Sequence, residues 1–421
     1  MGRIRKIGSA HCNYSQILYQ FLTFTQNLKR SPKNIKYLTR NAKLVCAADF
    51  FWNLGRTFPH AILTIFLLEQ GFDLVRIATL QSVFMIVAMV TEFPSGIWAD
   101  LFGRKQIYMA AVVTLFCSYL LIGFFSDHFI VILFAYVLYG LSVALKSGTL
   151  EAEVVLEFEK EQRDIKAYSV ASSYVMSISS IAGGLLGSLF YEKMHSYMYA
   201  ISLMLFVLAF LMAALCVFSQ TSGQKEREQR HLRDELKVGF CVLKSSKPLL
   251  YMILLFASAT LFVQPFFQYW QVLYQQGGIP VRYFGIIYVA FQACNLVGTM
   301  IYNRMKMSNK KIMIFVWLIA IIFAFSMINT QLALFLLPVS VILFYVFYQH
   351  LDVLQKKVAP KQFMSSFFSL VGTSENIASI VSLFIMATCI EYVGITYAYI
   401  ILFFMFSVCT YICYLLFLKD K

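Results

Sequence analysis

The chain has 421 residues, of which 60% are apolar and only 13% are charged, and its mean hydropathy is +0.70. Soluble proteins carry about 25% charged residues, so this surplus of apolar side chains excludes a soluble enzyme. The net charge of +14 does not indicate a nucleic-acid partner, because nucleic-acid binders display their basic side chains on a polar surface. The composition instead predicts a membrane protein with many spans. Its nine cysteines show no CxxC or Cys/His spacing and predict neither a disulfide framework nor a metal site.

The first 43 residues are expected to form a basic cytoplasmic tail. Residues 1–43 contain nine Lys or Arg and no Asp or Glu, and they lack the apolar core and cleavage site of a signal peptide. The tail is either an irregular basic segment on the anionic lipid surface or, in its middle part, a helix that lies in that surface.

Twelve runs of about 20 mostly apolar residues are long enough to cross a bilayer as helices. They are continuous and rich in Leu, Phe and Ile, without the alternation of polar and apolar residues that is typical of membrane barrels. We therefore expect an all-α integral membrane protein. The predicted spans are 45–68, 77–98, 107–126, 129–149, 168–190, 197–218, 249–273, 282–302, 311–328, 331–352, 364–390 and 394–418.

The basic residues predict the orientation of the chain. If the N-terminus is cytoplasmic, 31 of the 35 Lys and Arg fall in cytoplasmic segments and three in outer loops, and the remaining one is Arg56 in the first span. Basic residues gather on the cytoplasmic side of membrane proteins. We therefore expect a multi-pass protein of the cell membrane with both termini in the cytoplasm.

Ionisable side chains inside spans are costly, and they are candidate functional groups for that reason. Asp49, Arg56 and His60 fall in the first span, Glu92 in the second and Glu375 in the eleventh. Arg56 lies about twelve residues, roughly 18 Å, into its span, and His60 follows one helical turn later. We expect Arg56 to pair with Glu92 or Glu375. Such a pair either binds and releases a proton or permanently holds the helices together.

The loop after the second span carries a specific motif. It reads Gly96-Ile-Trp-Ala-Asp100-Leu-Phe-Gly103-Arg104-Lys105. This segment resembles G-x-x-x-D-x-x-G-R-K, the signature loop of the major facilitator superfamily, and the resemblance extends over the whole chain in its number of spans and loop pattern. The chain is similar to the secondary transporters of that family, in particular to bacterial exporters of drugs and other small molecules.

The resemblance implies that this loop latches two six-helix bundles in the outward-open state. Gly96 would let its helix approach a neighbour closely, and Asp100 would meet the N-terminal dipole of a helix in the other half. Gly103 would allow a tight turn. Glu151 after the fourth span would pair with Arg104, or else belong to a solvated acidic loop. The expected latch comprises Gly96, Asp100, Gly103, Arg104, Lys105 and Glu151.

A highly charged segment divides the chain into two similar halves. It contains the run KEREQRHLRDELK and separates six predicted spans from the next six. This arrangement is typical of transporters built from a repeat. The expected domains are the tail 1–43, an N-terminal bundle 44–218, a cytoplasmic linker 219–248 and a C-terminal bundle 249–418.

The seventh span carries polar residues with helical spacing. Gln264, Gln268 and Gln271 recur at positions i, i+4 and i+7 and share one face of the helix. The resemblance places this helix at a central cavity, where amides and aromatic rings would contact a substrate; alternatively, they form hydrogen bonds between helices. The expected cavity residues are Gln264, Gln268, Tyr269, Gln271, Gln292 and Asn295.

The predicted function is secondary transport by alternating access. No enzyme motif is present, no catalytic residue or cofactor is expected, and the absence of a P-loop argues against an ATP-driven pump. We favour efflux of a hydrophobic or amphipathic molecule driven by the proton gradient. The alternatives are an uptake permease for a polar nutrient, such as a sugar or carboxylate, and a membrane sensor or scaffold that does not transport. The expected partners are a small-molecule substrate and the lipid bilayer, without nucleic acid, and we expect a monomer.

Overall fold

The computed structural model describes residues 38–147, 149–163, 166–218, 247–305, 309–358 and 364–419, and all regular elements in these ranges are helices. The predictions for the tail 1–43 and the linker 219–248 therefore lie almost entirely outside the described residues. The expectation of an all-α membrane protein is confirmed.

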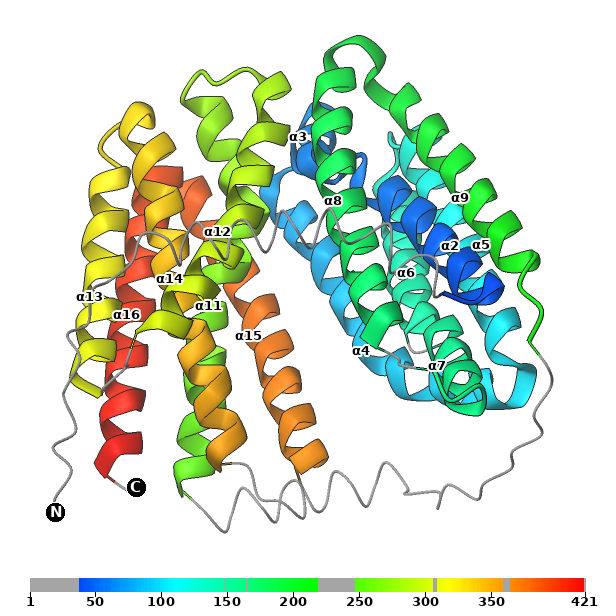
Figure 1. The fold of residues 1–421 in the computed structure, drawn as a ribbon. Helices are drawn as coiled ribbons and strands as arrows, with labels where there is room; N and C mark the ends of the chain where they lie inside the picture. Colours follow the sequence, from blue (N-terminus) through cyan, green and yellow to red (C-terminus); the bar gives the residue numbers. More distant parts are fainter. Residues whose placement is uncertain are drawn as a thin grey trace, which may run out of the picture.

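The helices of the first half pack around α2 and α5 (Figure 1). Helix α2 contacts α8 and α9, while α5 contacts α6 and α9, and α4 contacts α6. Thr39 caps the start of α2 by accepting a hydrogen bond from the Ala42 amide (3.0 Å). The elements are α2 (Arg40–Thr57), η1 (His60–Ile62), α3 (Leu63–Glu69), α4 (Leu74–Phe102), α5 (Arg104–Phe124), α6 (Phe129–Lys146), α7 (Leu150–Lys160), α8 (Lys166–Met194), η2 (His195–Tyr197) and α9 (Met198–Ala214).

The second half packs around α11. This helix contacts α15 and α16, while α13 contacts α14 and α16, and α12 contacts α14. Its core is largely aromatic: the ring of Phe262 meets those of Phe323 and Phe403, with centroids 5.2 and 4.3 Å away. The elements are α11 (Lys247–Gln276), η3 (Val281–Tyr283), α12 (Phe284–Arg304), α13 (Asn309–Ser326), α14 (Thr330–Val358), α15 (Met364–Val393) and α16 (Ile395–Lys419).

Large apolar side chains cover much of the outer surface. Ile130, Phe335 and Phe404, for example, are 78%, 75% and 64% exposed, which is stable only against lipid. Within the described ranges, nine helical segments are long and apolar enough to cross a membrane, on α4, α5, α6, α8, α11, α12, α14, α15 and α16. The apolar stretches of α9 and α13 are shorter. The count of twelve spans therefore stays a prediction, although helices occur in all twelve predicted places.

The first predicted span is broken. It was expected to run continuously over 45–68, but α2 ends at Thr57 and the chain continues through η1 into α3. Pro59 lies at the break, and proline has no N–H with which to continue a helix. His60 therefore lies in η1 and not in the α-helix that carries Arg56, so α-helical spacing from Arg56 does not apply to it.

The two halves contact each other at the end of the molecule where α3 and the start of α4 meet the end of α11. The hydroxyl of Thr64 donates to the carbonyl oxygen of Gln268 (3.1 Å), and the side chain of Gln268 donates back to the Thr64 hydroxyl (3.2 Å). Nearby, α8 contacts η3 and α12. We call this the contact end. At the opposite end α4 turns into α5 at Gly103, and the basic residues Arg104 and Lys105 follow. We call this the basic end.

Toward the basic end the halves diverge, and α4 and α15 separate (Figure 1). A Cβ atom built on Gly96 of α4, or on Gly372 of α15, would meet no atom within 4 Å. The expectation that Gly96 permits a close helix contact is thus wrong for this conformation. At the contact end the packing is tight instead, since a Cβ on Gly285 of α12 would lie 2.6 Å from the backbone oxygen of Gly184 on α8.

Candidate functional site

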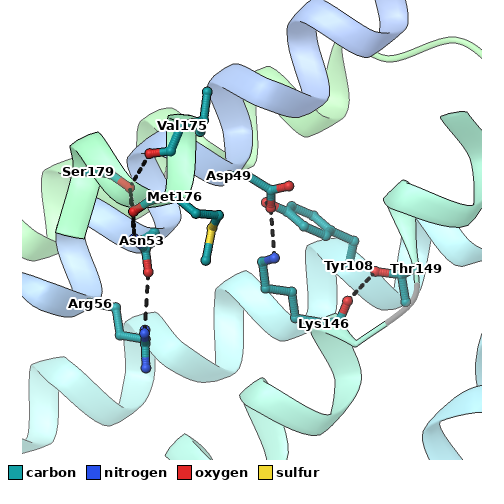
Figure 2. Close-up of polar contacts among 9 residues, drawn as sticks. All are labelled: Asp49, Asn53, Arg56, Tyr108, Lys146, Thr149, Val175, Met176 and Ser179. Atoms are coloured by element: carbon teal, nitrogen blue, oxygen red, sulfur yellow. Dashed lines mark hydrogen bonds and ion pairs between the residues drawn. The ribbon is translucent and has the colours of Figure 1, made fainter. Parts of the chain in front are cut away.

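A buried ion pair links α2 to the end of α6 (Figure 2). The Nζ of Lys146 lies 2.9 Å from Oδ1 of Asp49, and the Tyr108 hydroxyl donates to the same oxygen (3.1 Å). The Lys146 ammonium also lies over the ring of Trp52, 4.9 Å from its centroid. Asp49 is therefore held by Lys146 and Tyr108.

One turn further along α2, Asn53 connects this helix to α8. Its amide nitrogen lies within hydrogen-bond distance of the Met176 carbonyl oxygen (3.1 Å), the Ser179 hydroxyl (2.7 Å) and the Ser180 hydroxyl (2.8 Å). Its side-chain oxygen accepts a hydrogen bond from Nη2 of Arg56 (3.3 Å; Figure 2). Asn53 thus fixes the guanidinium of Arg56 from the side of α8.

Arg56 has an aromatic environment. Its guanidinium carbon lies 5.4 Å from the ring centroid of Trp52, and the Tyr119 hydroxyl donates to its backbone oxygen (2.8 Å). Tyr139 of α6 and Tyr288 of α12 are close enough to interact with its charge. Arg56 is therefore surrounded by rings from both halves of the molecule.

The expected carboxylate partner of Arg56 is not found among the described residues. No ion pair within 4 Å involves Arg56, and its Nε atom is buried without a hydrogen-bond partner, as is Nε1 of Trp52. The Glu375 carboxylate instead accepts hydrogen bonds from Tyr348 of α14 (2.9 Å) and, more weakly, Thr260 of α11 (3.4 Å). Glu92 is exposed on α4. The structure separates the charges that sequence reasoning had paired.

A cavity of about 300 Å³ opens beside these groups. Its wall comes from α2, α5, α6 and the start of α7, and it brings together two basic, two acidic and two aromatic side chains. The lining residues are Asp49, Trp52, Arg56, Tyr108, Val143, Lys146, Ser147, Leu150 and Glu151. Of the predicted site residues, Asp49, Arg56 and Glu151 lie here, whereas Glu375 lies in the second half.

The glutamines of α11 lie mostly at the contact end. Besides the exchange between Gln268 and Thr64, the amide of buried Gln271 donates to the His60 backbone oxygen (3.4 Å), and the Tyr269 hydroxyl donates to the Leu74 carbonyl oxygen (3.4 Å). In this conformation these side chains join the two halves, which corresponds to the alternative interpretation as interhelical hydrogen bonds.

The remaining polar residues of the expected cavity set behave differently. Gln292 on α12 is exposed, and its amide donates to the Tyr288 hydroxyl (2.8 Å). The ring of Tyr288 meets that of His60 edge-on, with centroids 6.0 Å apart. Gln264 and Asn295 are half-buried. His60 and Gln292 therefore both approach Tyr288, close to Arg56.

The signature loop is held within its own half. Gly103, between α4 and α5, has φ = +92°, a conformation that favours glycine. Arg104 forms an ion pair with Glu153 of α7 (3.7 Å), not with the expected Glu151, which is exposed. The side chain of Asp100 lies outside the described residues.

Lys105 connects the signature loop to the end of α9. Its Nζ donates hydrogen bonds to the carbonyl oxygens of Ala214 and Cys216 (2.7 Å each), which lie at the C-terminal end of α9. Basic side chains stabilise helix C-termini in this way, because the last carbonyl groups have no partner within the helix.

Sequence reasoning missed Trp52, Asn53, Tyr108 and Lys146. Trp52 and Asn53 precede Arg56 by four and three residues, so helical spacing from the buried arginine would have found them. Lys146 was counted among the basic residues that set the orientation, and nothing in its neighbourhood distinguished it from them.

Comparison with known proteins identifies relatives of the chain. A family model described as Major Facilitator Superfamily matches residues 45–349. An uncharacterized MFS-type transporter, YxaM of Bacillus subtilis (strain 168), is 25% identical over 232 residues, which cover 53% of this chain and 56% of that protein. The match thus spans little more than half the length of this relative.

Solved structures of similar fold extend over most of the chain. The nucleoside transporter NupG superposes with a TM-score of 0.73 at 15% identity and covers 91% of this chain and 99% of its own. A bacterial homologue of the iron transporter ferroportin, in an inward-facing state, has a TM-score of 0.68 at 15% identity, with 90% and 98% covered. At such identities the likeness concerns the fold alone.

Proposed function

The chain belongs to the major facilitator superfamily of membrane transporters, and from this premise we propose that it carries a small organic molecule across the cell membrane by alternating access. The observation that carries the proposal is the asymmetry of the two halves. They are joined by hydrogen bonds and close glycine packing at the contact end, and they diverge at the basic end. A rocking motion that exchanges these two arrangements would expose a central site to each side in turn.

The basic end faces the cytoplasm in this proposal, and both termini lie there. The support is the distribution of Lys and Arg, with 31 of 35 in segments that would then be cytoplasmic. With this orientation the conformation described here is open toward the inside.

Proton coupling is proposed to depend on Glu375. Its carboxylate is half-buried on α15 and interacts with two neutral hydroxyl groups, those of Tyr348 and Thr260. Glu375 has no basic partner within the part of the chain that the structure describes, and a carboxylate in such a site can bind and release a proton as its hydration changes. Glu92 is exposed here and supports this role less well.

Export of an amphipathic molecule is the direction we propose. The rings of Trp52, Tyr139 and Tyr288 near Arg56 suit a substrate with an apolar body, and this supports the proposed direction. Uptake of a polar nutrient is the second candidate, because the cavity lining also contains Arg56 and Lys146.

The test of this proposal does not require an identified substrate. Everted and right-side-out membrane vesicles from cells that produce the protein are incubated with an extract of cellular metabolites, energised with a proton gradient, and analysed by mass spectrometry. We expect at least one compound to accumulate in everted vesicles only when the protein is present, and a protonophore should abolish this. Accumulation only in right-side-out vesicles would indicate uptake, and no protein-dependent compound in either preparation would contradict transport.

Glu375→Gln tests the coupling in the same assay. The variant should lose accumulation driven by the proton gradient but keep exchange of the compound without a gradient, because only the coupling group is removed. Glu391→Gln, an exposed position near the end of the same helix, is the matched control and should behave like the wild type. Undiminished accumulation by Glu375→Gln would show that coupling does not use this carboxylate.

A further inference from the structure

We propose that the cavity between α2, α5, α6 and α7 binds the anionic group of the substrate, and that the substrate is an organic anion with a flat apolar body. The inference rests on the proposed function in calling the ligand a substrate. The binding chemistry is argued from the cavity alone. The proposed function left the charge of the substrate open for export and for uptake alike. The present inference assigns the substrate a negative charge.

The first observation is a pair of unused donors in one cavity wall. Among the described residues, Nε of Arg56 and Nε1 of Trp52 are both buried without an acceptor, and both residues line the cavity. Trp52 is only 4% exposed. A buried donor without an acceptor costs about 1–3 kcal/mol, so this wall has a deficit of acceptors. Neither atom is accessible from the cavity in this conformation, so a ligand acceptor would meet them only after small rotations of the two side chains.

The second observation is how the charges of the wall are distributed. Asp49 is engaged by Lys146 at 2.9 Å and by Tyr108 at 3.1 Å, and so it does not neutralise Arg56. Arg56 lies seven residues beyond Asp49 along α2, about 10 Å further from the basic end. The other acidic group, Glu151, is exposed at the start of α7. The inner part of the cavity is therefore positive, although the lining as a whole carries two charges of each sign.

The third observation is that Arg56 is held in place before a ligand arrives. Asn53 accepts a hydrogen bond from Nη2 and is itself tied to α8, and Tyr119 donates to the backbone oxygen of Arg56. A guanidinium that is already oriented loses little freedom on binding, and its forked donors can bind two oxygens of a carboxylate, phosphate or sulfonate. The ring of Trp52 beside it offers a flat apolar surface.

Other ligand classes fit the cavity less well. A cation would be repelled by Arg56, and a neutral sugar would leave the charge of Arg56 without a counter-ion. The volume of about 300 Å³ is at the lower end for small-molecule sites, which favours a compound of one or two rings.

Equilibrium binding to the full-length protein in lipid nanodiscs tests this inference. The probes are 1-naphthoate, its neutral analogue 1-naphthamide and its cationic analogue 1-naphthylmethylammonium, with naphthyl phosphate and naphthalene sulfonate as further anions. At least one anion should bind about tenfold or more tightly than the amide, as expected for a charge-assisted hydrogen bond. If no anion is preferred over the amide, or if the cation binds best, the inference is wrong.

Variants locate the binding. Arg56→Gln should abolish the preference for the anion, Arg56→Lys should retain part of it, and Trp52→Phe, which keeps a ring but lacks the Nε1 donor, should weaken anion binding severalfold. Arg76→Gln is the matched control, because Arg76 is exposed and pairs with Asp73 at the start of α4. An anion preference that survives in Arg56→Gln would place the site elsewhere and overturn the assignment.

This test separates the inference from the proposed function. Binding at equilibrium requires no transport. If the protein prefers the anion but no compound is transported in vesicles, transport is contradicted and the assignment of the binding site is still supported. Transported compounds together with equal binding of the anion and the amide would contradict the inference alone.

Discussion

Replacing Gly285 with alanine should open the contact end. Gly285 lies in the first turn of α12, where a Cβ atom would be 2.6 Å from the backbone oxygen of Gly184 and 2.8 Å from the Cα of Leu185 on α8. Ordinary contacts of a Cβ begin near 3.4 Å. The nearest atom, Oγ of Ser188, can rotate away, but the two backbone atoms cannot, so the two helices must separate by more than half an ångström.

The size of the effect follows from the cost of overpacking. An added methyl group in a tight interface costs about 1–3 kcal/mol, and only the conformation in which α8 meets α12 bears this cost. The population ratio between the closed and open contact end should therefore fall by about 5- to 150-fold. Gly372→Ala is the control, since a Cβ at this position of α15 meets nothing within 4 Å.

Distances between spin labels at Tyr197 and Gln276, both exposed, measure the opening. Labels carried by unnatural amino acids leave the nine native cysteines in place. In Gly285→Ala a longer distance should gain population relative to the wild type and to Gly372→Ala. An unchanged distribution in Gly285→Ala would refute the reasoning that this glycine holds the contact end closed.

Three further predictions concern the first half. Lys105→Met should lower the free energy of unfolding in detergent by about 1–2 kcal/mol, because the carbonyl groups at the end of α9 lose two charged hydrogen bonds, whereas Lys193→Met at an exposed position should not. A double-mutant cycle of Asp49→Asn and Lys146→Met should give a coupling energy of about 1–3 kcal/mol; additive effects would mean that their 2.9 Å contact adds nothing to stability. Cys216, just beyond the last turn of α9, is fully buried, so iodoacetamide should modify it far more slowly in the folded than in the unfolded protein, as peptide mass spectrometry can measure.

Much of the fold could be predicted because long apolar runs permit few alternatives in a membrane. A run such as 129–149 has to satisfy its backbone hydrogen bonds internally, which a helix does, and α6 is found at Phe129–Lys146. The break in the first span was missed because the apolar run 45–68 continues on both sides of Pro59.

The candidate site was predicted only in part, and the reason is physical. Depth in the membrane follows from the number of residues along a span, so Arg56 could be selected as a buried charge. Which carboxylate Arg56 meets depends on the rotation of each helix about its own axis and on the conformation of the protein. Neither can be read from the sequence. Arg56 and Glu375 were paired because both lie deep in their predicted spans. In the structure Arg56 donates a hydrogen bond to Asn53, and Glu375 accepts one from Tyr348.

Reciprocal motion of the two ends is the central requirement of alternating access, and label pairs on both ends of one variant measure it directly. A second pair at Leu101 and Lys357, exposed positions at the basic ends of α4 and α14, is combined with the pair at Tyr197 and Gln276 in Gly285→Ala. We predict that the population with a longer distance at the contact end has a shorter distance at the basic end. Opening of the contact end with an unchanged distance at the basic end would contradict alternating access in this protein.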